Sequence, residues 1–183
     1  MKSLKGKLAA VTGAGSGIGR AVAIDLARRG CRVAASDIQA DAVAETVRLI
    51  KSAKGDAKAY SFDVADREAF YQHAAAVKKD FKAPANLVIN NAGVGLAASV
   101  LEMKWEDFEW LMGINFWGVC YGTQAFLPQL IESRDGHVVN VSSIFGLIGT
   151  PNHSDYCASK FAVRGFTEAL MVELQESPIS VHL

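Results

Sequence analysis

The sequence predicts an α/β fold, a doubly wound parallel sheet within a single domain. Short apolar runs alternate along the chain with amphipathic segments of helical period, which is typical of strands that pair in parallel beneath covering helices. A glycine-rich turn directly follows the first apolar run. The chain has 183 residues, half of them hydrophobic, and that is enough to bury one core.

The apolar periodicity assigns each element in order. The predicted strands cover 8–11, 32–36, 57–62, 86–90 and 136–142, and a sixth begins at 179. The predicted helices run from the glycine turn to Gly30, then over 41–51, from an Asp66 cap to Lys79, over 105–133 with a kink at Pro128, and over 154–176 from a cap at Ser154 or Asp155. The longest loop covers 94–104.

Charge and cysteine content exclude several kinds of protein. Lys plus Arg number 19 and Asp plus Glu also number 19, so no net charge attracts nucleic acid or an anionic membrane. The three cysteines, Cys31, Cys120 and Cys157, lack metal-ligand spacing and indicate thiols in a reducing compartment, which predicts a cytoplasmic protein without a metal site. The basic N-terminus precedes too few apolar residues for a signal peptide.

The segment 110–131 contains no charged residue. Its amides, its glycines and Pro128 make it less apolar than a membrane-spanning helix usually is. We therefore expect a buried helix, and because a helix without charges needs cover on more than one side, we expect a partner subunit there. Phe126 is the position at which we expect an outward-facing side chain.

The glycine-rich turn has the pattern Thr12-Gly13-x-x-x-Gly17-Ile18-Gly19. Between a strand and a helix, such a turn lets the backbone approach a ligand, and the free N–H groups and the helix dipole favour a pyrophosphate. This is a Rossmann-like arrangement, although the spacing differs from the usual dinucleotide motif. Glycine turns that bind nothing also exist, so this match alone is a weak signal.

Asp37 ends the second predicted strand, 18 residues beyond Gly19. A carboxylate at that place accepts hydrogen bonds from the hydroxyls of an adenosine ribose and repels a 2′-phosphate, which favours NAD over NADP. No Arg or Lys occupies positions 14, 16, 36 or 38. The alternative is that Asp37 caps the helix within 39–53.

Tyr156 and Lys160 are four residues apart, so on a helix they share one face. A free tyrosine has a pKa of about 10, and a neighbouring cation favours the phenolate that acid/base chemistry needs. The hydroxyl of Ser143 would then hold a substrate oxygen. The same pair also occurs on ordinary exposed helices. Asn115, inside the apolar stretch, is equally typical of a hydrogen-bonded core amide.

Taken in order from Thr12 to Lys160, these motifs resemble the short-chain dehydrogenase/reductase family. Asp63-Val64 and Asn90-Asn91-Ala92-Gly93 add to the glycine turn, Asn115, Ser143 and the Tyr156/Lys160 pair. The resemblance implies a catalytic set of Asn115, Ser143, Tyr156 and Lys160, with Asn115 holding a water that connects Lys160 to solvent. Ser143 is preferred to Ser142 because it lies 13 residues before Tyr156, the family's usual interval.

The resemblance also implies contacts to the cofactor. Gly13, Gly17 and Gly19 would bind the pyrophosphate, Asp63 and Val64 would flank the adenine, and Asn90 would support the cofactor and the central strands. The full set of expected cofactor-binding residues is Gly13, Ser16, Gly17, Ile18, Gly19, Asp37, Asp63, Val64, Asn90, Ala92, Gly93, Tyr156 and Lys160.

By the same resemblance, the chain is expected to be an NAD-dependent oxidoreductase that interconverts a secondary alcohol and a ketone. The competing hypothesis is a non-catalytic NAD-binding or interaction protein of the same fold. Family members continue beyond the sixth strand into a lid and a last strand, which we expect to be missing from residues 1–183. A homodimer or homotetramer is expected to form through the helices at 110–131 and 154–176. Leu96, Ile144, Phe145, Leu147 and Ile148 form either an apolar substrate wall or plain core.

Overall fold

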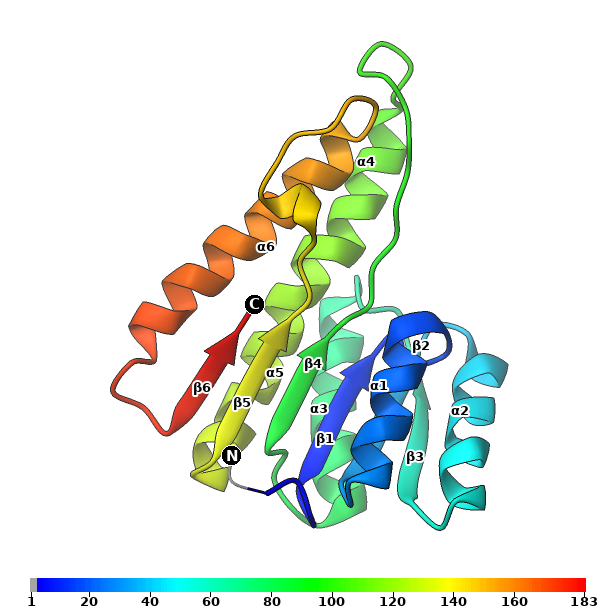
Figure 1. Cartoon of the computed structure of the whole chain (residues 1–183), viewed down its shortest axis with the longest axis vertical. Coiled ribbons are helices and arrows are strands. Elements are labelled where there is room, and N and C mark those ends of the chain that lie inside the picture. The colour runs from blue at the N-terminus through cyan, green and yellow to red at the C-terminus, as the bar shows by residue number, and fades with distance from the viewer. Residues whose placement is uncertain (1–2) are drawn as a thin grey trace.

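A computed structural model describes residues 3–183 as a six-stranded parallel sheet in the order β3-β2-β1-β4-β5-β6 (Figure 1). The strands are β1 (Leu8–Thr12), β2 (Arg32–Asp37), β3 (Asp56–Ser61), β4 (Leu87–Asn90), β5 (Gly136–Asn140) and β6 (Ile179–His182). The helices are α1 (Gly17–Arg28), α2 (Ala40–Ser52), α3 (Arg67–Phe81), α4 (Trp105–Met112), α5 (Gly118–Ser133) and α6 (Ser154–Glu173). The predicted doubly wound fold is confirmed.

The alternation of side chains along β1 divides the core into two layers. Leu8 and Ala10 point into a cluster with α3, α5 and α6, whereas Ala9 and Val11 point into a cluster with α1 and α2. Every residue of β1 is buried, as a central parallel strand requires. Strand order reverses between β1 and β4, and α/β sheets bind their ligands at such a switch point.

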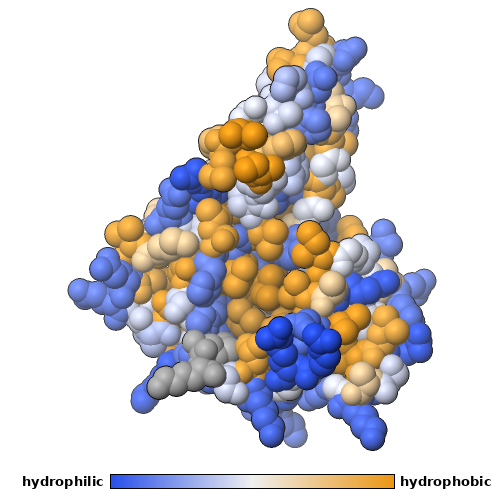
Figure 2. Space-filling model, in the orientation of Figure 1, coloured by the Kyte–Doolittle hydropathy of each residue, from blue (hydrophilic) through white to orange (hydrophobic). Residues whose placement is uncertain are grey.

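The near face of β5 and β6 in Figure 1 is covered by no helix of residues 3–183. Val139 and Val141 are only partly buried there, beside the cluster under α1 and α2. Figure 2 shows hydrophobic surface over the middle of the sheet in the same view. Within residues 3–183, the β5–β6 edge of the sheet is therefore covered by helices on one face only.

The segment predicted as one helix over 105–133 is helical throughout, as α4, a π-helical turn at Gly113–Trp117, and α5 in succession. Pro128 lies within α5, but the change of helix type occurs earlier in the chain, at Gly113. The turn holds Asn115, whose side chain bonds the backbone of Val94. π turns inside α-helices occur frequently at functional sites.

Several predicted boundaries hold and others are wrong. Asp66 caps α3 by accepting from Ala69 N at 3.0 Å, and Gly30 takes the left-handed φ of 89° after α1. Neither Ser154 nor Asp155 caps α6, because the N-cap residue is His153 and Asp155 is buried in the first turn. The fifth strand ends at Asn140 instead of Ser142, and α6 ends at Glu173.

The expected outward position in α5 is also wrong. Phe126 is fully buried, because it packs toward α3 with its ring 5.8 Å from that of His73. The exposed aromatic side chains of this region are Trp105, Trp110 and Trp117. Within the part of the chain that the structure describes, no helix is long and apolar enough to cross a membrane.

Candidate active site

A cleft of about 1020 Å³ lies at the carboxyl ends of the strands. The glycine turn and Asp37 line one end, and Tyr156 and Lys160 line the other. Of the residues predicted to form the site, the cleft brings together Gly13, Ser16, Gly17, Ile18, Gly19, Asp37, Asp63, Val64, Ala92, Gly93, Ser143, Tyr156 and Lys160. Asn90 and Asn115 do not line it and lie behind its wall.

The turn between β1 and α1 has no room for side chains at Gly13, Gly15 or Gly19. Gly13 has a φ of 65°, and a Cβ there would lie 2.9 Å from the Cα of Ala92. A Cβ on Gly19 would overlap the carbonyl oxygen of Gly13. These glycines bring the backbone of α1 close to β4, so that the helix N-terminus opens into the cleft.

Thr12 and Asn91 join the ends of β1 and β4. The Thr12 hydroxyl oxygen accepts from the backbone N–H groups of Asn91 and Ala92, each at 3.0 Å. The Asn91 amide donates back to the Thr12 carbonyl at 2.9 Å. This reciprocal pair fixes the floor of the cleft at the switch point of the sheet.

Asp37 is bound to the glycine turn. Its Oδ2 accepts from Gly15 N at 2.8 Å and its Oδ1 accepts from Gln39 N at 3.0 Å. The cap residue of α2 is Gln39, so Asp37 does not cap that helix and instead closes the turn in front of it. Arg20 also binds this turn: its guanidinium group donates to the Gly15 carbonyl and, at 2.9 Å, to the Thr46 hydroxyl.

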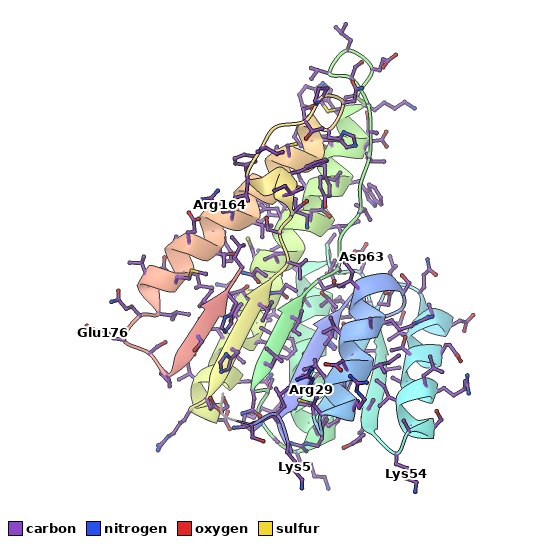
Figure 3. The ribbon with its side chains drawn as sticks, viewed as in Figure 1. Lys5, Arg29, Lys54, Asp63, Arg164 and Glu176 are labelled. Atoms are coloured by element: carbon purple, nitrogen blue, oxygen red, sulfur yellow. The ribbon has the colours of Figure 1, made fainter. Side chains whose placement is uncertain are left out.

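Asp63 follows β3 and lies near the carboxyl ends of the strands (Figure 3). Its side chain is exposed and accepts from Ala65 N at 2.9 Å, while the neighbouring Val64 is buried. The two residues thus present a carboxylate and an apolar face side by side, next to Asp37 in the lining of the cleft.

Lys160 is buried on the inner side of α6. Burial lowers the pKa of its ammonium group from 10.5 to about 8. The Nζ atom donates to the Val141 carbonyl at 3.0 Å and lies 5.7 Å from the centre of the Tyr156 ring. The predicted helical pairing of Tyr156 with Lys160 is therefore present, with the cation directed into the cleft wall.

The two serines after β5 have different roles. Ser142 donates its hydroxyl to the Lys160 carbonyl at 3.0 Å, which ties the strand end to α6. Ser143 Oγ accepts from Phe145 N at 3.2 Å, so its own hydroxyl hydrogen remains available to the cleft. The contact between Ser143 and a substrate stays a prediction.

The side chain of Asn115 is already fully engaged by the protein as a donor. Its Oδ1 accepts from Val94 N at 2.8 Å, and its Nδ2 donates to Val94 O at 2.9 Å and to Ser159 Oγ at 3.2 Å. The amide thus fixes the start of the 94–104 loop and the π turn. Ser159 was not predicted; the only signal was its place between Tyr156 and Lys160.

Asn90 belongs to a buried polar network beneath the site. Its Nδ2 donates to Asn140 Oδ1 at 2.8 Å and Thr123 Oγ1 at 3.2 Å, and Asn140 donates to Thr167 Oγ1 at 3.0 Å. These bonds connect β4, β5, α5 and α6. Asn140 and Thr167 were missed because polar side chains within apolar periodic runs carry no pairing signal until the strands are placed in register.

A family model described as short chain dehydrogenase matches residues 7–183. The chain belongs to this family. SadH, a protein of Mycobacterium tuberculosis strain H37Rv named as an oxidoreductase, is 49% identical over 174 residues, which cover 95% of the chain and 63% of SadH. Epidermal retinol dehydrogenase 2 of Mus musculus is 39% identical over 94% of the chain and 56% of its own length.

Solved members of the short-chain dehydrogenase family share the fold closely. An enzyme from Burkholderia phymatum in complex with NAD superposes with a TM-score of 0.95 at 33% identity, over 99% of this chain and 65% of that one. A metagenomic short-chain oxidoreductase in complex with NADP gives a TM-score of 0.93 at 30% identity, over 98% of this chain and 81% of that one. The present chain thus spans about two thirds of the length of SadH and of the Burkholderia enzyme.

Proposed function

We propose that residues 1–183 form the NAD-binding catalytic domain of an oxidoreductase that transfers a hydride between NAD(H) and a secondary alcohol or ketone. The observation that carries the proposal is the placement of Tyr156, Lys160 and Ser143 at one end of a cleft whose other end is the glycine turn. Family membership supports the general class of reaction.

The residues at the glycine end fit a dinucleotide. Positions Gly13 and Gly19, where a Cβ would collide with the backbone or with Asn91, leave a backbone cradle at the N-terminus of α1. Ser16 and Ile18 are exposed beside it. We assign the pyrophosphate to Gly13, Ser16, Gly17, Ile18 and Gly19, the adenosine to Asp37, Asp63 and Val64, and the nicotinamide side to Ala92, Gly93, Tyr156 and Lys160.

When bound, the nicotinamide supplies or accepts the hydride. In alcohol oxidation, Tyr156 takes the hydroxyl proton at its phenolic oxygen, and in ketone reduction it donates that proton. The Lys160 ammonium favours the ionised form of the phenol. Ser143 donates its hydroxyl hydrogen to the substrate oxygen and so holds it beside Tyr156.

In this proposal, Asn115 and Asn90 do not react with the substrate but hold the surrounding backbone in place. Asn115 holds the Val94 backbone and the π turn, and a water beside that turn would connect Lys160 to solvent. Because both N–H groups of the Asn115 amide are used within the protein, the water would be held by its remaining Oδ1 lone pair or by a backbone carbonyl of the turn. Asn90 keeps β4 and β5 aligned beneath the cofactor.

We infer a preference for NAD over NADP from the Asp37 carboxylate. A 2′-phosphate there would meet a negative charge fixed in place by Gly15 N and Gln39 N. Arg20, the nearest cation of the turn, is held by the Gly15 carbonyl and by Thr46. The three unpaired thiols favour a reducing compartment such as the cytoplasm.

A homodimer or homotetramer through 110–131 and 154–176 remains our proposal for the assembly. Exposed Trp110, Trp117 and Phe161 support it, since all three lie within these segments. Trp110→Glu should dissociate the assembly, whereas Lys54→Glu, a charge change beyond the end of α2, should not. Analytical ultracentrifugation at micromolar concentration distinguishes these outcomes, and a wild-type monomer would refute the proposal.

The proposed reaction is tested on the complete gene product by NADH absorbance with a panel of secondary alcohols and ketones. Tyr156→Phe keeps the ring and removes the acid/base group, so turnover should fall roughly 100-fold or more while NADH affinity is retained. Wild-type turnover in this variant would remove Tyr156 from the mechanism. NADH binding without turnover of any substrate would favour a non-catalytic cofactor-binding protein.

A further inference from the structure

The substrate end of the cleft contains one titratable side chain that the proposed reaction does not use. Among the residues that line the cleft, the titratable ones are Asp37, Asp63, His153, Tyr156 and Lys160. Asp37 and Asp63 follow β2 and β3, on the glycine-turn side of the cleft, and Tyr156 and Lys160 are the acid/base pair. His153 is left without a role.

The ring of His153 is held in one hydrogen-bonding state. Its Nδ1 lies 2.9 Å from the carbonyl oxygen of Pro151, and because a carbonyl only accepts, Nδ1 carries the hydrogen. Within residues 3–183, Nε2 has no hydrogen-bonding partner. In the neutral ring, Nε2 is therefore a lone-pair acceptor on a side chain that lines the cleft.

Contacts on both sides fix where this acceptor lies. His153 is the N-cap residue of α6 and forms a parallel bridge with Ala98, and Ala98 N donates to Asn152 O at 2.9 Å. The two loops concerned run side by side above the sheet in Figure 1. The ring packs edge to face on Phe145, with centroids 5.4 Å apart, and Phe145 packs likewise on Tyr156 at 5.9 Å.

The other side chains around His153 make it chemically distinct. Leu96, Ala97 and Phe145 line the same end of the cleft and offer no polar side-chain atom. Ser142 and Ser143 lie at the reacting centre, where Ser142 is bonded to α6. A substrate that fills this end would thus meet apolar side chains and, away from the reacting carbon, a side-chain acceptor at Nε2.

We propose that His153 determines specificity: its Nε2 accepts a hydrogen bond from a second hydroxyl of an otherwise hydrophobic alcohol or ketone substrate. The inference rests on the proposed function, because it assumes that the reacting carbon lies at Tyr156. The ring of Phe145 lies between Tyr156 and His153. The second hydroxyl of the substrate should therefore be several carbon atoms away from the reacting carbon.

The test uses the complete gene product with NADH and a series of methyl ketones of increasing chain length, each paired with its ω-hydroxy analogue. Wild type should favour the hydroxylated member of one pair roughly tenfold in kcat/KM, and the preferred chain length reports the distance between Tyr156 and His153. Plain ketones should show no such dependence on His153.

Two variants separate the specificity role from a structural one. His153→Asn retains a donor at the place of Nδ1, for the Pro151 carbonyl, but has no group at the place of Nε2; His153→Gln has an amide oxygen that reaches the place of Nε2. The proposal expects the His153→Asn enzyme to lose the preference for the hydroxylated ketone and the His153→Gln enzyme to keep part of it. Both variants should have unchanged kcat/KM on plain ketones. Ser154→Ala, at an exposed neighbouring position, is the control.

The outcomes that overturn the proposal are distinct. If the His153→Asn enzyme keeps the preference for the hydroxylated ketone and the His153→Gln enzyme loses it, His153 acts only by holding the loop through its bond to the Pro151 carbonyl. If wild type turns over the ketones without any preference, the specificity role is wrong while the proposed function stands. If wild type reduces no ketone at all, the proposed function fails and the inference fails with it.

Discussion

The two ends of the cleft are built by different means. At the glycine end, the shape depends on atoms that are absent: side chains on Gly13 or Gly19 would collide with neighbouring backbone or with Asn91. At the reacting end, the shape depends on side chains, since Asn115, Ser142 and Lys160 each bond the backbone of another segment. Substitutions at the glycine end should therefore impair cofactor binding by steric overlap. Substitutions at the reacting end should act through the loss of a charge or of a hydrogen bond.

The largest effect is expected at the glycine end. Gly19→Val places a branched side chain where even a Cβ overlaps the Gly13 carbonyl, so the turn must move and NADH affinity should fall by roughly 100-fold or more. Calorimetric titration measures the affinity. A variant that binds NADH normally would show that the turn is not the pyrophosphate site.

Gly165→Ala is the matched control for this substitution. Gly165 lies within α6, and a Cβ there meets no atom within 4 Å. Because alanine loses less entropy than glycine in a helix, the variant should gain about 0.5–1 kcal/mol of stability without any change in NADH affinity. Comparison of Gly19→Val with Gly165→Ala thus tests whether the loss of NADH affinity comes from close packing at Gly19 and not simply from replacing a glycine.

The next effect concerns the charge at the reacting end. With a folded pKa of about 8 and an unfolded value of 10.5, Lys160 loses its proton earlier in the folded protein than in the unfolded one. The cost of burying the ammonium is fully present below pH 8 and disappears as the pH rises to 10.5. Relative to Lys160→Met, the wild type without cofactor should gain up to about 3 kcal/mol across that window.

Urea unfolding from pH 7 to pH 10 measures this difference, and Lys54→Met controls for the loss of one surface cation. Parallel stability curves for wild type and Lys160→Met would contradict the burial argument. In the same variant, NADH affinity should fall at pH 7, where wild-type Lys160 still carries its charge, and the deficit should shrink as the pH rises above 8.

The sequence predicts some parts of this site and not others, depending on whether a residue belongs to a local pattern or to a contact between distant segments. The glycine turn, Asp37 and the Tyr156/Lys160 pair are local patterns that are weak singly and specific only when taken in order along the chain, and the cleft brings them together. The engagement of Asn115 with Val94, and of Asn90 with Asn140, depends on which segments meet in space. The sequence has no local signal for such contacts.

The same reason explains the errors in the helices. Phe126 was assigned outward because the apolar stretch shows no polar stripe to mark its surface, yet its ring meets His73 in the core. The π turn was missed because Gly113–Trp117 continues a helical pattern in the sequence, and only the backbone of the structure distinguishes it from an α-helix. His153 was overlooked because the more obvious capping residues, Ser154 and Asp155, follow it.

A smaller effect is expected behind the glycine end. His73 stacks on Phe62 with centroids 4.6 Å apart, neither ring nitrogen has a partner among the described residues, and burial lowers its pKa from 6.5 to about 3. The folded protein therefore keeps His73 neutral while the unfolded chain takes up a proton below pH 6.5, so stability falls as the pH falls toward 3. Phe62 itself lines the cleft.

His73→Phe keeps the aromatic packing and removes the titration. At pH 5 the variant should be more stable than wild type by roughly 2 kcal/mol, with a smaller gain at pH 7 from the loss of two unpaired nitrogens. Guanidinium unfolding at both pH values provides the measurement. An equal gain at both pH values would mean that the folded protein protonates the ring as readily as the unfolded chain does, which contradicts the burial argument.

The smallest effect tests whether charge matters at the glycine end at all. NAD(H) should bind at least tenfold tighter than NADP(H), because a phosphate beside the Asp37 carboxylate without a counter-charge costs more than about 1.4 kcal/mol. Asp37→Asn removes the charge and keeps one acceptor oxygen, for Gly15 N or for Gln39 N, because the other oxygen becomes an NH2 group that cannot accept. Calorimetric titration of both cofactors should therefore show the preference shrinking while NAD(H) affinity changes little. If the ratio of affinities is unchanged in Asp37→Asn, this carboxylate shapes the turn and does not select the cofactor, and the glycine end would then work by backbone geometry alone.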